Sequence, residues 1–350
     1  MALITTLQEY YEERYQALEI SLMESVSSRM GREFRKIFQI CMGHWQEILR
    51  EACAVQEEEK IPCGYMSISF LNTSLMEGNP LFQVDFYNEE WVYGEPWMRG
   101  RMPADFLFRE WAEFCRTALD DSFYVRSKLQ PPAIKTLFWG TAERLVYLFS
   151  CFAKYFMKDL SDLSEFQSLK KEASMYVTCG MYLDWQERIY AVLPSLDLKD
   201  LPDNEETAFR EFREIVCHGN VFRDADLRHC RFYDCTFRNC VFEQVDLSDA
   251  YFRNCHFYDT DFSQVKVAGC VWEEGIFRSC GFQDSDTQAE GDEYFAEAEM
   301  VRSKLFGLRV QGCDFSYFLL RDCSLEDVRL ESTKTEHSDW KSYGEVEPDG

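Results

Sequence analysis

Cysteine is the residue type in this sequence whose spacing most invites a chemical explanation. Eight of the fifteen cysteines recur at multiples of five residues within two stretches: Cys230, Cys235, Cys240, Cys255, Cys270 and Cys280, then Cys313 and Cys323. Thiolates bind zinc, but the spacing C-x4-C-x4-C over 230–240 matches no common zinc pattern. A stacked pair such as Cys235 and Cys255 would form a disulfide only under oxidising conditions. We therefore expect reduced thiols and no metal site.

Other residues that carry chemistry are scattered. The five histidines show no metal spacing such as H-x3-H: His44, His218, His229, His256 and His337. The sequence has neither a glycine-rich phosphate loop nor a G-x-S-x-G nucleophile motif. We therefore predict no catalytic residue and no cofactor, so the protein is expected not to be an enzyme. An enzyme or effector site within residues 64–215 stays open as an alternative.

The charge balance restricts the partners. The chain of 350 residues carries a formal net charge of −25, which repels nucleic acid and anionic membranes and leaves basic partners open. The N-terminus MALITTLQEYYEERYQ lacks the basic region of a signal peptide. Four charged residues interrupt the apolar stretch 133–157, which favours a buried helix over a membrane span. A cytoplasmic protein with no membrane contact is the expectation.

The residues before about 200 favour helices, and we predict a mostly α-helical domain over 1–200. Apolar residues recur at spacings of three and four over 1–59. Further helices are expected over 103–118 and 131–158, with two more within 161–193 and a short one over 205–217. The polar stretch 198–204 marks the domain boundary.

Residues 64–93 change period and predict a small β-hairpin. Met66, Ile68 and Phe70 alternate with other side chains, and so do Phe82, Val84 and Phe86. The turn cluster MEGNP separates the two runs, and a third strand is expected at 91–93. Trp91, Tyr93 and Trp97 follow beside glycine and proline. Core packing is the ordinary explanation for these rings, and a groove for a partner or ligand is the alternative.

From residue 220 the apolar residues repeat every five positions, which suits neither a helix nor a strand. Thirteen bulky residues follow in one phase: Phe222, Leu227, Phe232, Phe237, Phe242, Leu247, Phe252, Phe257, Phe262, Val267, Trp272, Phe277 and Phe282. Two positions before each lies a second series, mostly small or β-branched, to which the first six of these cysteines belong; Cys313 and Cys323 take the same position in the later stretch. The other three positions in five are mostly polar.

This pattern resembles the pentapeptide-repeat family, whose consensus is A(D/N)LXX; Ala225-Asp226-Leu227 is its plainest copy here. The resemblance covers about 220–285 and returns over about 308–330. It implies a right-handed quadrilateral β-helix, in which each pentapeptide forms one side and cysteine replaces the family's small inward alanine. Residues twenty apart then stack, so Phe232 should lie beneath Phe252 and Trp272, and Phe237 beneath Phe257 and Phe277.

The ends and the interruption of this solenoid need separate predictions. The 205–217 helix is expected to cap its first coil. An insertion over 286–307 is expected to contain a short helix over 290–305. The step from Phe282 to Val310 is not a multiple of five, so the insertion either loops out or shifts the register. Further repeats follow over 308–331, and 332–350 is expected to be a disordered tail. An exposed solenoid end would let two chains pair as a homodimer.

The fold class is thus α+β multidomain, a helical domain with a hairpin followed by a β-helix. The resemblance implies a bacterial protein, and rigid solenoids suit protein–protein interaction. We predict a non-catalytic scaffold, adaptor or regulator that contacts another protein. Its candidate interaction ladder is Arg238, Tyr258 and Arg278, spaced by twenty residues. Some members of the family imitate DNA toward gyrase, which is the alternative, although the outward charges here are of mixed sign.

Overall fold

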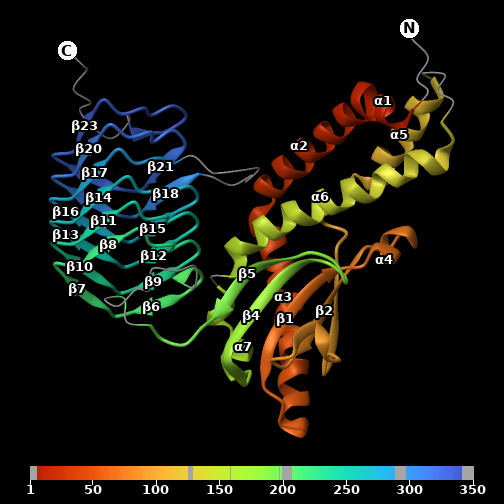
Figure 1. Ribbon diagram of the computed structural model, residues 1–350, viewed down its shortest axis with the longest axis horizontal. Coiled ribbons are helices and arrows are strands. Elements are labelled where there is room, and N and C mark those ends of the chain that lie inside the picture. The colour runs from red at the N-terminus through yellow and green to blue at the C-terminus, as the bar shows by residue number, and fades with distance from the viewer. Residues whose placement is uncertain are drawn as a thin grey trace. The chain divides into compact units, whose positions relative to one another are not determined.

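The computed structural model describes residues 6–124, 129–157, 159–196, 198, 207–287 and 297–340. The chain divides into two compact units, Met1–Tyr190 and Ala191–Gly350 (Figure 1). No helix within these described ranges is both long and apolar enough to cross a membrane.

Helices open the first unit, as the spacing of apolar residues predicts. They are α1 (Leu7–Tyr10), the π-helical turn η1 (Tyr11–Tyr15), α2 (Gln16–Arg32) and α3 (Phe34–Glu59). Thr6 caps α1 by accepting a hydrogen bond from the backbone N–H of Glu9, whose carboxylate accepts from the N–H of Thr6. The chain leaves helical geometry at Glu33, and α3 ends at Lys60 in a left-handed conformation. The longer helices α5 (Trp111–Tyr124) and α6 (Pro131–Met157) follow later in the chain.

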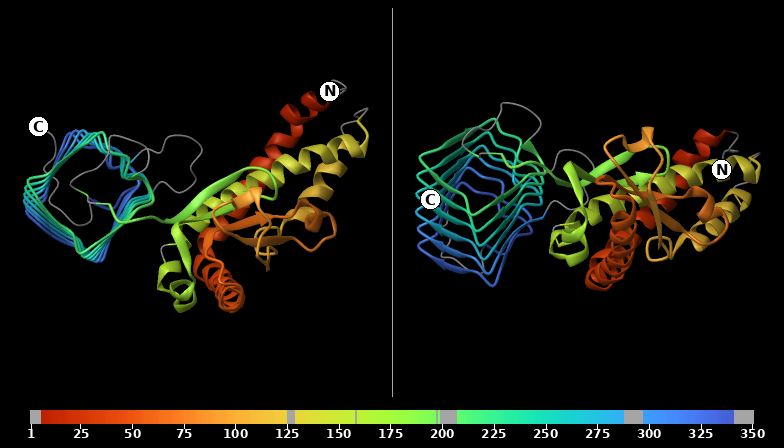
Figure 2. Two further views of the ribbon diagram at one scale, coloured as in Figure 1. Left: turned by 60° about the horizontal axis from the view of Figure 1, so that its bottom comes forward. Right: turned by 90° about the horizontal axis from the view of Figure 1, so that it is seen from below.

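A five-stranded sheet forms the other layer of this unit, in the order β3-β2-β1-β4-β5 (Figure 2). Its strands are β1 (Cys63–Phe70), β2 (Leu81–Tyr87), β3 (Met98–Pro103), β4 (Lys171–Met181) and β5 (Gln186–Val192). β1 pairs with β2 in antiparallel and with β4 in parallel orientation. The alternating apolar residues of β1 and β2 are fully buried on one face, where α3 packs against β3 and α6 against β4.

The hairpin prediction is correct for β1 and β2, but two neighbouring predictions are wrong. The third strand is β3, whereas residues 91–93 form a 3-10 turn, η2 (Trp91–Tyr93). A short helix, α4 (Asn72–Met76), precedes the expected turn at Gly78. The two helices expected within 161–193 are mostly β4 and β5, after the short η3 (Leu160–Asp162) and α7 (Ser164–Ser168). Gly180 is expected to interrupt a helix, but it lies in β4, where a Cβ atom would come within 2.2 Å of the Trp185 carbonyl oxygen in the turn before β5.

The second unit is a β-helix with three strand-forming sides and a fourth side held by single bridges. Each sheet contains six parallel strands, and the views along and across the stack show the coils in register (Figure 2). The first sheet is β6 (Glu211–Arg213), β9 (Arg231–Tyr233), β12 (Tyr251–Arg253), β15 (Val271–Glu273), β18 (Ala298–Val301) and β21 (Phe318–Arg321). The second is β7 (Val216–His218), β10 (Thr236–Arg238), β13 (His256–Tyr258), β16 (Ile276–Arg278), β19 (Lys304–Phe306) and β22 (Ser324–Glu326). The third is β8 (Val221–Arg223), β11 (Val241–Glu243), β14 (Asp261–Ser263), β17 (Gly281–Gln283), β20 (Arg309–Gln311) and β23 (Arg329–Glu331).

The five-residue period follows from this geometry. The central residue of each strand points inward, and the predicted stacks are confirmed. Ring centroids of Phe232 and Phe252 lie 4.4 Å apart, and those of Phe252 and Trp272 lie 5.7 Å apart, with nearly parallel planes. Corner residues such as Asp234 and Asn254 have positive φ, so each corner turns through the left-handed region that Asp, Asn and Gly tolerate best.

The small inward position is also polar in a way that alanine is not. The Cys255 thiol donates to the carbonyl oxygen of Phe232, 3.4 Å away, and also approaches that of Arg253. Cys280 repeats this pattern, and Thr260 uses its hydroxyl in the same way. Cysteine, serine and threonine thus satisfy carbonyl oxygens of the preceding coil, which explains why these residue types fill the position.

Three predictions about the ends and the insertion are wrong for the described residues. Residues 207–217 form no capping helix: they contain β6 and the start of β7, and Phe212 stacks beneath Phe232 at 5.0 Å. The expected helix over 290–305 is replaced from Ala298 onward by β18 and β19, while 290–296 lie outside the described residues. Residues 332–340 are ordered, and Trp340 is buried against Phe315 and Phe318. The remainder of the expected tail, 341–350, lies outside the described residues.

The insertion does not shift the register. Trp272 pairs with Met300, and Phe282 pairs with Val310, each at a spacing of 28 residues. The eight residues beyond one coil therefore fall between Thr287 and Glu297. Two repeats that the sequence analysis missed follow at once, with Met300 and Leu305 as their buried central residues.

Candidate functional site

The outward side chains of β10, β13, β16 and β19 form a continuous ladder. Arg238 pairs with Tyr258, Tyr258 with Arg278, and Arg278 with Phe306. The Arg238 guanidinium lies 4.2 Å from the centroid of the Tyr258 ring, and that of Arg278 lies 5.3 Å from the Phe306 ring. We call these four residues the arginine–aromatic ladder.

The repeat itself positions the ladder. Each member follows a buried central residue by one position, so the pleat directs it outward while the residue before it anchors the strand. Twenty residues separate the first three members, and the sequence predicts their alignment. Phe306 follows Arg278 by 28 residues, because the insertion intervenes. The sequence does not predict Phe306 as a member of the ladder, because it falls in the expected insertion 286–307.

The two guanidinium groups of the ladder differ from most arginines of the β-helix. Arg223 pairs with Glu243, Arg302 with Glu273 and Glu274, and Arg321 with Glu299. Within the described residues, Arg238 and Arg278 are exposed and have no carboxylate within 4.0 Å. A guanidinium over a ring keeps its five N–H donors directed outward, where a partner's carboxylates can accept them.

A neighbouring row of outward side chains on the same sheet adds further cationic and aromatic groups to this surface. It contains Thr236, His256, Ile276 and Lys304 between the ends of the stack. The His256 and Tyr258 rings meet edge to face at 6.2 Å. A protein of net charge −25 thus has one sheet whose outward residues include three cations beside aromatic and aliphatic groups. Only Glu326, on the last strand, is acidic among its described outward side chains.

The cysteines of the repeats lie inside the tube, where burial raises the pKa of most of them, whereas the neighbouring Cys255 thiol lowers the pKa of Cys235. Burial raises the pKa of the Cys230 and Cys280 thiols to about 12 and that of Cys313 to about 11. Burial also raises the pKa of Cys255 strongly. None of the fifteen cysteines forms a disulfide, and no cluster able to hold a metal ion occurs within the ranges that the structure describes. Thiols whose pKa is raised are poor nucleophiles at neutral pH.

The three aromatic residues proposed for a groove have different surroundings in the structure. Trp91 stacks on Tyr65 at 4.9 Å, and its indole N–H donates to the Ser67 hydroxyl. Trp97 packs against Phe86 at 5.3 Å. Tyr93 is 94% exposed. Among the described residues, Trp91 and Trp97 thus pack against different side chains, and Trp91 covers Tyr65 and Ser67 of β1.

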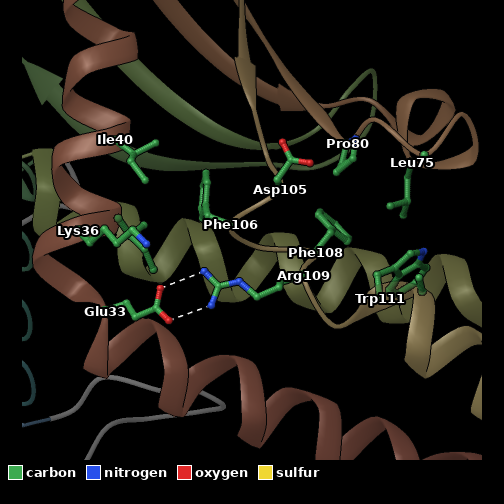
Figure 3. Close-up of a pocket in the computed structure, with 13 residues that line it drawn as sticks. Glu33, Lys36, Ile40, Leu75, Pro80, Asp105, Phe106, Phe108, Arg109 and Trp111 are labelled. Atoms are coloured by element: carbon green, nitrogen blue, oxygen red, sulfur yellow. Dashed lines mark hydrogen bonds and ion pairs between the residues drawn. The ribbon is translucent and has the colours of Figure 1, made fainter.

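The first unit does contain a pocket, formed by other residues (Figure 3). Its volume is about 500 Å³, and it lies between the start of α3, the turn after α4 and the segment that leads into α5. None of its lining side chains is a serine, cysteine or histidine, so it holds no nucleophile–base pair of the usual kind. The sequence does not predict this pocket, because its three walls come from segments far apart in the chain.

Comparisons with known proteins concern the repeat region. A family model described as a pentapeptide repeat region matches residues 212–289. No curated protein sequence matches the chain.

Several solved structures resemble part of this chain. Full-length QnrB1, a plasmid-mediated fluoroquinolone resistance protein, is 14% identical with a TM-score of 0.20, covering 39% of this chain and 91% of that one. The pentapeptide repeat protein Rfr23 from the cyanobacterium Cyanothece 51142 is 12% identical with a TM-score of 0.17, covering 37% and 90%. HetL from Nostoc sp. strain PCC 7120, involved in heterocyst differentiation regulation, is 11% identical with a TM-score of 0.14, covering 37% and 87%. Similarity at this level says nothing of what this chain binds.

Proposed function

We propose that this pentapeptide repeat protein is a non-catalytic protein–protein interaction protein, and that its arginine–aromatic ladder contacts an acidic surface of another protein. The proposed role is that of a scaffold, adaptor or regulator in a bacterial cytosol. The observation that carries the proposal is the pair of exposed guanidinium groups, Arg238 and Arg278, stacked on rings and without carboxylate partners in the described chain.

The ladder has the composition of a binding surface. Arginine and tyrosine are enriched at the residues that dominate binding energy in interfaces. The rings restrict the arginine side chains before binding, which lowers the entropy cost of association. The parallel coils beneath them are fully paired, so this surface requires no rearrangement to meet a partner.

The charges of the β-helix do not favour imitation of DNA. A protein that replaces DNA needs rows of acidic groups at the spacing of phosphates. The third sheet instead shows Arg223 beside Glu243, and on the bridged side two lysines, Lys266 and Lys334, interrupt a row of four aspartates. Neighbouring charges of opposite sign reduce the field that such imitation requires.

Charge reversal tests the proposal. The tagged protein is cross-linked in cells of its native host, purified, and compared with Arg238→Glu/Arg278→Glu. The matched control is Arg309→Glu/Arg329→Glu, which makes the same charge change on the third sheet. We expect the ladder variant to recover its main partner at least tenfold less, and the control to recover it as the unmodified chain does. Equal recovery by both variants, with unchanged melting temperatures, would refute the role of the ladder.

A further inference from the structure

The pocket of the first unit has rigid apolar walls. Phe106 and Phe108 are nearly buried, and Ile37 and Leu75 complete the apolar surface. Phe108 stacks on Phe70 of β1 at 4.6 Å, and the ring of Trp111 meets it edge to face at 5.7 Å. Because these rings also belong to the core of the unit, the pocket keeps its shape without a ligand.

One ion pair in the pocket is internally satisfied. The Arg109 guanidinium donates to both carboxylate oxygens of Glu33, at 2.9 and 3.0 Å. This pairing lowers the pKa of Glu33 and keeps both groups charged. The pair therefore cancels its own charge and forms one side of the opening (Figure 3).

Two further charged groups of opposite sign remain available. The Lys36 ammonium makes no hydrogen bond or ion pair with any described residue, and neither does the Asp105 carboxylate. Lys36 projects from α3 at the end of the pocket near Glu33, and Trp111 lies at the other end (Figure 3). Asp105 and the two phenylalanines lie between them.

We propose that this pocket binds a small zwitterion with an apolar side chain, of the class of free leucine or phenylalanine. Asp105 accepts hydrogen bonds from the ligand ammonium, and Lys36 donates to the ligand carboxylate. The apolar side chain lies against Phe106, Phe108 and Trp111. The site belongs to the first unit alone, so it does not depend on the proposed role of the ladder.

The lining disfavours ligands of other charge. An anion would satisfy Lys36 but would face Asp105. A simple cation would satisfy Asp105 but would face Lys36. An uncharged apolar molecule would shield two charged groups from water without replacing their hydrogen bonds, which costs free energy. The volume of about 500 Å³ lies within the usual range for small-molecule sites.

The test is a ligand series measured on the full-length protein by ligand-detected NMR and calorimetry. The probes are L-phenylalanine, L-leucine, 2-phenylethylamine without the carboxylate, and 3-phenylpropionate without the ammonium. We expect saturable binding of both amino acids and at least tenfold weaker binding of each single-charge analogue. Failure of both amino acids to saturate, or equal binding of the two analogues and L-phenylalanine, would overturn the proposal. This arm needs no variant, so it cannot be confused with a folding defect.

Two exposed substitutions then assign the charges. Lys36→Met should weaken L-phenylalanine about tenfold without weakening 2-phenylethylamine, whereas Asp105→Asn should weaken L-phenylalanine without weakening 3-phenylpropionate. Lys135→Met and Asp184→Asn are matched controls on exposed positions elsewhere in the unit and should change nothing. Binding that persists unchanged in both Lys36→Met and Asp105→Asn would refute the assignment.

Discussion

The buried polar contacts of the first unit join residues far apart in the sequence, whereas those of the β-helix recur at short fixed intervals. The Tyr15 hydroxyl meets the Thr141 hydroxyl across 126 residues, and Arg29 pairs with Glu110 across 81. In the β-helix, thiols and hydroxyls donate to carbonyl oxygens two and 23 residues earlier. The buried polar contacts of the first unit are thus unique residue pairs, whereas those of the β-helix repeat the same geometry in each coil.

This difference separates the two candidate functions. A repeating tube places side chains in straight rows, so a row of like chemistry becomes a flat contact surface such as the arginine–aromatic ladder. Unique long-range contacts hold three separate segments around a hollow, as in the pocket at Asp105. If the two units are independent, a destabilising substitution in one unit should leave the amide hydrogen exchange of the other unchanged.

The largest effect is expected from Phe257→Ala. This side chain is fully buried and stacks between Phe237 at 5.0 Å and Phe277 at 4.7 Å. Its removal should cost about 3–5 kcal/mol of the free energy of unfolding of the β-helix. Hydrogen exchange should increase throughout Ala191–Gly350 and remain unchanged in the first unit. Phe257→Leu, the milder control, should cost less than half as much; equal loss of protection in both units would contradict the comparison.

Glu19→Ala makes the reciprocal test in the first unit. The buried Glu19 carboxylate accepts hydrogen bonds from the Thr141 hydroxyl at 2.6 Å, the Tyr11 hydroxyl at 3.2 Å and the Arg144 guanidinium. Losing this acceptor should destabilise the unit by about 2–3 kcal/mol. Exchange should rise in α2 and α6 and not in the β-helix. Glu24→Ala, on the exposed side of α2, should change the free energy by no more than about 0.5 kcal/mol.

The inward thiols predict a dependence on alkaline pH. Burial raises the pKa of Cys280 from its ordinary 9.0 to about 12. Below pH 9 the thiol is neutral in both states, so its contribution to stability is complete. Between pH 9 and 12 the unfolded chain loses this proton and the folded one keeps it, so stability falls by up to about 1.4 kcal/mol per pH unit for each such thiol.

Cys280→Thr should remove the part of this alkaline loss of stability that comes from the Cys280 thiol. Thr260, which lies twenty residues earlier, shows that threonine fits the position and makes the same hydrogen bonds. Urea unfolding should find the variant close to the unmodified chain at pH 8 and more stable by about 1 kcal/mol at pH 10. An identical pH dependence for both proteins would mean that Cys280 ionises equally in the folded and unfolded states.

The smallest stability effect is expected from the ladder itself. Arg238→Ala removes an exposed cation–π contact, so it should cost less than about 1 kcal/mol in thermal unfolding. A larger cost would show that the ladder contributes to the stability of the coil, and would weaken the argument that its arrangement serves a partner.

The difference between the two units also explains how much of each can be predicted from the sequence. The stack of Phe232, Phe252 and Trp272 follows from a count of five, because each position in the repeat has one environment. The count failed at β6 and β7, where Cys217 takes the place of a bulky central residue, and at β18, where the insertion breaks the phase. In the first unit, the spacing of apolar residues predicts single helices and strands, but not which of them pack together.

The two candidate sites differ in the same way. The alignment of Arg238, Tyr258 and Arg278 can be read from the repeat, but Phe306 cannot be placed without knowing that 28 residues make one coil there. The pocket joins residues near 36, 75 and 105, whose proximity depends on the packing of α3 against the sheet. Alternation in β4 is present at Met175, Val177 and Cys179, and it is the one missed signal that a stricter count would have found.

The most direct test of the central claim is site-specific photocross-linking in the native host. A benzophenone amino acid replaces Tyr258 on the ladder or, as the control, Ser263 on the adjacent sheet, both partly exposed. We predict that a discrete protein is captured from position 258 and is absent or greatly reduced from position 263. Capture that is equal from the two positions, or found from 263 alone, would contradict the assignment of the ladder as the binding surface.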